Sequence, residues 1–123
     1  MLINLSNHPS SNWTSEQLIA AQEYGKVIDL PFPNIDPFSG VEYIQSVCND
    51  YLQEIYSICR DGACPISKLT VHIMGEMTFT FTMVNVLKRQ GITCVAATTE
   101  RVTTMENDVK TSTFRFVNFR KYN

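Results

Sequence analysis

The hydrophobic pattern of the chain predicts short strands that alternate with amphipathic helices. Four apolar runs have the length of buried strands and are bounded by turn residues: 2–5, 27–30, 69–74 and 92–97. Three longer segments carry apolar side chains at spacings of three and four and end just before a glycine: 15–24, 41–61 and 78–90. This order predicts parallel strands joined by helical crossovers.

The pattern changes after the fourth apolar run. Residues 100–105 and 111–119 are rich in threonine and phenylalanine, and Asn107-Asp108 supplies a turn between them. These two segments therefore predict an antiparallel hairpin. We expect a single α/β domain over residues 1–123, with a small Rossmann-like, mostly parallel sheet, helices on both faces and a C-terminal β-hairpin.

Length and charge narrow the classes of partner. The 123 residues suffice for one core, and the net charge of -2 argues against a protein that coats long nucleic acid with a basic face. No apolar run approaches the roughly 18 residues of a membrane span, and the N-terminus lacks the pattern of a signal peptide. We therefore expect a cytoplasmic protein without membrane contact.

The candidate metal and cofactor motifs are absent from the sequence. None of the four cysteines forms a CxxC pair, and His8 and His72 are not spaced with them as zinc ligands are. Reduced cysteines in such positions are common apolar filler. The Gly75 turn matches neither a P-loop nor GxGxxG. We expect free thiols, no metal and no cofactor.

Three polar segments each follow a predicted strand: 6–8, 75–78 and 98–101. Because parallel strands end at the same edge of a sheet, where α/β proteins bind ligands, we expect these segments to converge. The first and third helices begin at this edge, and their unpaired amides can hold a phosphate without a large positive net charge. The alternative is that Gly75 only supplies a turn.

Several side chains of these segments allow two interpretations. His8 can bind a phosphate or act as an acid or base near neutral pH, or it can simply bond a neighbouring carbonyl. His72 lies within a strand, which favours a satisfied core or interface histidine. Glu76 can complement the helix dipole or orient a ribose hydroxyl. Arg101 can pair with a phosphate or remain a solvated charge.

Four segments of the chain resemble a known family: Leu2–Pro9, the Gly75 turn with the following Met83–Asn85, Ala97–Val102 and Phe116–Tyr122. They are similar to very small CRISPR-associated proteins that consist of little more than a CARF domain. The resemblance implies a homodimer that binds cyclic oligoadenylate, with cyclic tetra-adenylate the expected ligand. Some such proteins cleave this messenger as ring nucleases and switch off type III CRISPR signalling, whereas others only sequester it.

The resemblance also implies roles for the polar segments. Metal-independent cleavage requires each ribose 2′-hydroxyl to lie in line with its phosphorus, which positioning and amide contacts can achieve. The implied ligand-binding residues are Ser6, Asn7, His8, Gly75, Glu76, Met77, Thr78, Thr98, Thr99 and Arg101. The implied catalytic residues are His8, Ser10 and Thr99.

The same segments leave the activity open. Glu76 is acidic where a phosphate is expected, and none of the three segments contains a lysine. A ring nuclease and a non-catalytic binding protein therefore both fit the sequence. A third alternative is an unrelated Rossmann-like domain that acts through its surface and binds no nucleotide.

Overall fold

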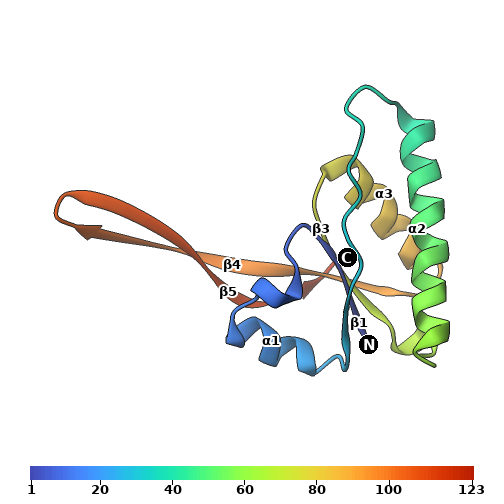
Figure 1. Cartoon of the computed structure of the whole chain (residues 1–123), viewed down its shortest axis with the longest axis horizontal. Coiled ribbons are helices and arrows are strands. Elements are labelled where there is room, and N and C mark those ends of the chain that lie inside the picture. Colours follow the sequence, from blue (N-terminus) through green and yellow to red (C-terminus); the bar gives the residue numbers. More distant parts are fainter.

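The computed structural model describes residues 1–123 and contains one five-stranded sheet with three helices (Figure 1). The strands are β1 (Leu2–Ser6), β2 (Val27–Asp29), β3 (Thr70–Met74), β4 (Thr93–Glu106) and β5 (Val109–Lys121). The helices are α1 (Ser15–Gln22), α2 (Val41–Asp61) and α3 (Met77–Arg89). Short 3-10 turns precede α1 at Ser10–Asn12 and β3 at Ile66–Lys68.

The sheet has the strand order β2-β1-β3-β4-β5. β1 pairs in parallel with both β2 and β3, β4 pairs in parallel with β3, and only β5 runs antiparallel. The order of the strands reverses between β1 and β3, which is the topological switch point where open α/β sheets bind ligands. The α/β class, the mostly parallel sheet and the C-terminal hairpin are thus confirmed.

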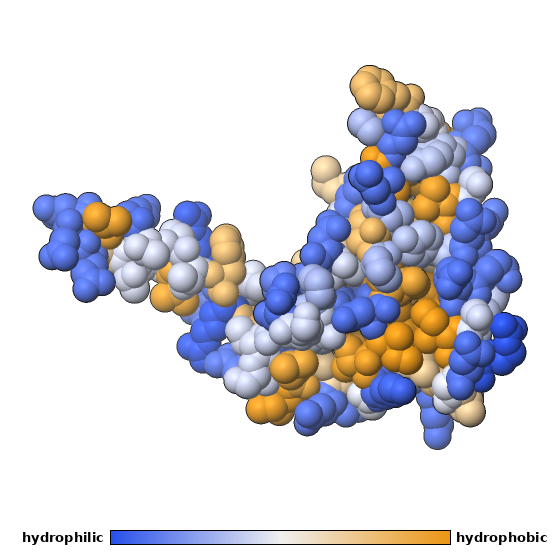
Figure 2. All heavy atoms as spheres, viewed as in Figure 1, coloured by the Kyte–Doolittle hydropathy of each residue, from blue (hydrophilic) through white to orange (hydrophobic).

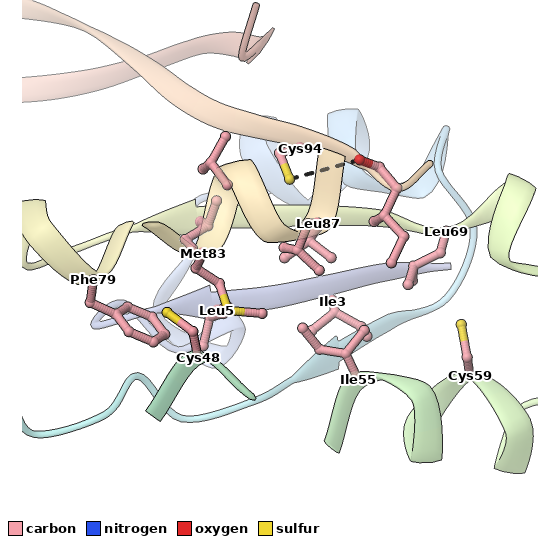
Figure 3. Close-up of a cluster of buried hydrophobic side chains, with 14 of the residues drawn as sticks. Ile3, Leu5, Cys48, Ile55, Cys59, Leu69, Phe79, Met83, Leu87 and Cys94 are labelled. Atoms are coloured by element: carbon pink, nitrogen blue, oxygen red, sulfur yellow. Dashed lines mark hydrogen bonds between the residues drawn. The ribbon is translucent and has the colours of Figure 1, made fainter. Parts of the chain in front are cut away.

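The larger core lies between the sheet and the helices α2 and α3. Phe79, Met83 and Leu87 from α3 are fully buried here, as is Ile55 from α2 (Figure 3). Burial raises the pKa of Cys94, in β4, to about 12. All four cysteines are free, and the three buried ones fill space in the core.

The smaller core lies on the opposite face of the sheet, under α1. Leu2, Trp13, Ala21 and Val95 form it, and Phe119 packs against it. α1 begins as the sequence predicts, because the Thr14 side chain accepts a hydrogen bond from the amide of the residue three positions on. Helices therefore cover both faces, which explains why every residue of β1 is buried.

β4 differs from its prediction, because one continuous strand replaces two separate ones. It pairs with β3 only over Thr93–Val95 and continues as a two-stranded ribbon with β5. Asn107 and Asp108 have positive φ values of 52° and 63°, as in a type I′ hairpin turn, which confirms the predicted turn. Figure 2 shows the ribbon as a narrow arm that projects from the body.

No helix of this fold has the length and apolar character needed to cross a membrane.

Candidate functional site

A cavity of about 460 Å³ lies where β1, β3 and β4 end or leave the sheet, on the face that α1 covers. Its volume falls in the range of roughly 300–1,000 Å³ that is typical of small-molecule sites. The lining residues are Ser6, Asn7, His8, Asn12, Thr14, Gln17, His72, Met74, Gly75, Ala97, Thr99, Phe114 and Phe116. The three polar segments named from the sequence therefore each reach this one cavity.

The predicted site residues divide into two groups by position. Five of them line the cavity: Ser6, Asn7, His8, Gly75 and Thr99. Six do not: Ser10, Glu76, Met77, Thr78, Thr98 and Arg101. Of the predicted site residues, the cavity therefore includes those at the end of β1, the glycine turn and a single threonine of β4.

Asn4, which is buried in β1, holds the wall of the cavity together. Its amide nitrogen donates to the His8 carbonyl and to Asp29 Oδ1, both at 2.9 Å. Its amide oxygen lies 2.8 Å from Ser6 Oγ and 2.8 Å from His72 Nδ1. One side chain thereby connects β1, β2, β3 and the loop after β1. Such a buried network favours a single arrangement of the groups that it joins.

This network positions His8 by its backbone and leaves its side chain exposed. The His8 carbonyl accepts a second hydrogen bond from Trp13 Nε1 at 3.0 Å, and its amide donates to Ser6 Oγ at 3.2 Å. The Ser6 hydroxyl is therefore engaged within the loop and supports it. The His8 imidazole is carried on a rigid backbone at the cavity wall.

Ser10 is held away from the cavity by Asp29. Its hydroxyl donates to Asp29 Oδ2 at 2.9 Å, and its amide lies 3.2 Å from Asp29 Oδ1. Ser10 is not among the residues that line the cavity, and its catalytic role stays a prediction. Its bonds to Asp29 instead attach the loop to β2.

A β-bulge separates the roles of Thr98 and Thr99. The pairing of β4 with β5 shifts by one residue between them. The Thr98 hydroxyl donates to the Asn118 side chain at 2.7 Å, whereas Thr99 lines the cavity. Bulges commonly redirect a side chain in this way. Arg101 lies farther along the ribbon, outside the cavity lining, and donates to Ser112 Oγ at 3.2 Å.

Glu76 accepts hydrogen bonds from backbone amides at the start of α3, where the sequence analysis expected a phosphate. Its carboxylate caps α3 by accepting hydrogen bonds from the amides of Thr78 and Phe79 and from the Thr78 hydroxyl. Glu76 and Thr78 face a different cavity, next to the loop before α2. The amides of Thr78 and Phe79, which were expected to hold a phosphate, are therefore bonded to a carboxylate of the chain itself.

Gly75 is explained by packing. A Cβ atom at this position would lie 2.2 Å from Cζ of Phe32. The half-buried Phe32 ring packs edge-to-face on Phe79, with the centroids 5.1 Å apart. Glycine thus lets the turn after β3 pass directly over an aromatic ring.

Removing the carboxylate cap should weaken α3. We expect Glu76→Ala to lower the free energy of unfolding by about 1 kcal/mol, the usual value of an N-cap. The Thr78 hydroxyl and the backbone amides lower the pKa of Glu76 below its usual 4.5. Glu76→Gln replaces the carboxylate by an uncharged amide. The excess in unfolding free energy of wild type over Glu76→Gln should therefore be complete above pH 4.5 and disappear as the pH falls through the lowered pKa of Glu76.

Urea denaturation at a series of pH values measures this effect. Glu42→Ala is the matched control, because Glu42 lies in the first turn of α2 without bonding its amides. An equal loss of stability in both variants would contradict the capping role of Glu76.

The cavity contains two ionisable side chains, His8 and His72, and no lysine or arginine. Burial, with a further contribution from the charge of His8, lowers the pKa of His72 to about 4. His72 is therefore neutral near pH 7. An anion in this cavity would depend on amides, hydroxyls and the exposed His8 for its contacts.

Several lining residues were not anticipated from the sequence. They come from the start of α1 and the turn before it, and from β3, β4 and β5: Asn12, Thr14, Gln17, His72, Met74, Ala97, Phe114 and Phe116. Thr14 carried a recognisable signal, because a helix N-cap after a predicted strand lies at the ligand-binding edge. The two phenylalanines carried none, since only the register of β5 against β4 places them beside Thr99.

The comparisons with known proteins give one match. The model of the uncharacterized protein MJ1673 family matches residues 1–120. No curated protein and no solved structure matches the chain. The matched span includes every residue of the cavity.

Proposed function

The chain therefore belongs to the uncharacterized protein MJ1673 family, and we propose that it binds cyclic oligoadenylate in the cavity beside β1, β3 and β4 and cleaves it as a ring nuclease. The observation that carries this proposal is the convergence of Asn7, Gly75 and Thr99 on one cavity. Five of the eleven residues that the resemblance to small CARF proteins implies line this cavity. The cellular role would be to end type III CRISPR signalling.

The chemistry of the lining suits part of a nucleotide. Phe114 is 70 % exposed and offers an aromatic face on which a base can stack, a contact that every base can make. Asn7, Asn12 and Thr99 offer amide and hydroxyl groups that can bond a ribose or a phosphate oxygen. The cavity thus combines an apolar platform with a polar wall, as nucleotide sites do.

A symmetric ligand suits a symmetric protein. Cyclic tetra-adenylate has two-fold symmetry, and a two-fold dimer presents the same patch twice. We propose a homodimer in which each subunit's cavity takes one half of the ring. This arrangement would double the number of polar contacts without adding a basic side chain.

The proposed reaction is an internal transesterification. The ribose 2′-oxygen forms a bond to the adjacent phosphorus, and the bond from that phosphorus to the 5′-oxygen breaks. The proton of the 2′-hydroxyl is passed on and the 5′-oxygen gains one, which leaves a 2′,3′-cyclic phosphate and a 5′-hydroxyl. His8 is the candidate for this proton movement, because its exposed imidazole is on a fixed backbone. Positioning in line supplies the rest.

One alternative is favoured by a specific observation. The cavity has no lysine or arginine, and the Ser10 hydroxyl is bonded to Asp29. A site with few groups to stabilise developing charge suits a protein that binds the messenger without cleaving it. Sequestration would lower the free messenger in proportion to the amount of protein.

A single assay tests the proposal and this alternative. Radiolabelled cyclic tetra-adenylate is incubated in EDTA with protein at sub-stoichiometric and excess concentrations. Multiple turnover to a linear product supports the ring nuclease, whereas a tight complex that returns intact ligand supports sequestration. Ligand at about 100 times its dissociation constant should add roughly 2.7 kcal/mol of stability. No thermal shift with any cyclic oligoadenylate would overturn both and favour a domain that acts through its surface.

A further inference from the structure

The floor of the cavity contains a buried polar atom without a partner. His72 is 2 % exposed and lines the cavity, and its Nε2 atom has no hydrogen-bond partner in the protein. Only one other buried side-chain atom lacks a hydrogen-bond partner, Thr80 Oγ1, and Thr80 does not line the cavity. Buried polar side-chain atoms are normally bonded, so this exception in a cavity requires an explanation.

The hydrogen-bond network determines which proton His72 carries. The Asn4 amide nitrogen faces two acceptors, the His8 carbonyl and the Asp29 carboxylate. The amide oxygen of Asn4 therefore faces His72, and an oxygen can only accept. Nδ1 of His72 must carry the hydrogen that it donates to Asn4 at 2.8 Å.

The remaining ring nitrogen then has a defined chemistry. His72 is neutral near pH 7, because burial and the charge of His8 lower its pKa. A neutral imidazole protonated on Nδ1 has a free lone pair on Nε2, which is a hydrogen-bond acceptor. The cavity floor thus offers an acceptor and needs a donor.

Aromatic packing holds the ring in place. Trp13 meets the His72 ring edge-to-face with the centroids 5.6 Å apart, and Phe119 does so at 5.3 Å. Together with the bond to Asn4, these contacts leave the imidazole little freedom to turn. The acceptor is therefore pre-organised, and a ligand would not have to order it.

We infer that His72 is a ligand-contacting residue whose Nε2 accepts a hydrogen bond from a donor group of the bound nucleotide. This inference rests on the proposed function and adds a specificity determinant to it. An adenosine nucleotide has two such donors, the ribose 2′-hydroxyl and the 6-amino group of the base. His72 selects ligands that present one of them at the cavity floor, because a ligand without it leaves the acceptor buried and unpaired.

The role of His72 is separate from that of His8. A group that stays unprotonated down to about pH 4 is a weak base near neutral pH and is poorly matched to proton transfer there. Loss of the acceptor should therefore weaken binding and raise KM, with a smaller effect on kcat. Loss of His8 should act mainly on kcat.

The test combines a conservative variant with ligand analogues. His72→Asn retains a side-chain amide that can donate to Asn4 in place of Nδ1, but it has no acceptor at the position of Nε2. The probes are cyclic tetra-adenylate, its 2′-deoxy analogue and its purine-riboside analogue, which lacks the 6-amino group. Affinity is measured by calorimetry for wild type and variant.

The expected result is a coupling between variant and analogue. Wild type should bind one of the two analogues about tenfold more weakly than the natural ring, and the analogue affected identifies the donor. His72→Asn should bind the natural ring about tenfold more weakly than wild type and should no longer distinguish it from that analogue. Thr80→Val, which removes the other unpaired atom, is the matched control and should leave all affinities unchanged.

Two results would overturn the inference. If His72→Asn binds all three probes as wild type does, or loses the same factor for each, Nε2 makes no specific contact with the ligand. A ¹⁵N shift of His72 Nε2 that does not change when wild type binds the ring would give the same answer without a variant. If wild type binds none of the probes, the proposed function fails, and this inference fails with it.

Discussion

Asn4→Ala should unfold at a lower urea concentration than any other single variant considered for this protein, with a loss of about 3 kcal/mol in unfolding free energy. Asn4 is 1 % exposed and bonds to the His8 carbonyl, Asp29, Ser6 and His72. Alanine removes the amide and leaves the His72 ring nitrogen and the Ser6 hydroxyl without their buried partner. The measurement is urea denaturation followed by circular dichroism, with an unchanged m-value expected.

Asn7→Ala is the matched control for this measurement. Asn7 is the same residue type in the loop after β1, but it is exposed and its side chain makes no hydrogen bond. Its replacement should change the unfolding free energy by no more than about 0.5 kcal/mol. Comparable losses in the two variants would show that the buried network does not hold the loop.

The second large effect is expected on catalysis. His8→Ala should slow single-turnover cleavage of cyclic tetra-adenylate by about 100-fold or more, the usual contribution of a general acid or base. Affinity for the ring should change much less. The variant should fold normally, because the contacts that fix His8 are made by its backbone and its side chain is exposed.

Rapid-quench kinetics with protein in excess separates this effect from binding. Ser10→Ala is the comparison, since its hydroxyl faces Asp29 and Ser10 does not line the cavity. It should cleave at a rate close to that of wild type. Equal rates for His8→Ala and wild type would remove His8 from the mechanism.

The pattern of the sequence was sufficient for the elements and their class. Apolar spacing is a local property, so it located all three helices and the parallel strands. Turn and cap residues act within a few positions of themselves, which explains why Thr14 and Asn107-Asp108 were identified correctly. The convergence of three polar segments also followed, because parallel strands end at one edge.

The length of β4 and the strands with which it pairs could not be predicted from its own residues. Threonine-rich segments form strands readily, but how far each strand has a neighbour depends on the rest of the sheet. β3 pairs with β4 only as far as Val95, so the remainder of β4 can pair only with β5. The projecting ribbon is therefore a property of the sheet as a whole.

The sequence by itself determined a Rossmann-like domain with a polar edge, and only the tertiary structure decided which polar groups of that edge are free. Asn4 and His72 lie 68 positions apart, yet their bond fixes the tautomer of a cavity residue. Gly75 is required by the ring of Phe32, which comes from a distant loop. Periodicity and turn chemistry are written in neighbouring residues, whereas hydrogen-bond partners and close packing depend on segments that meet only after folding.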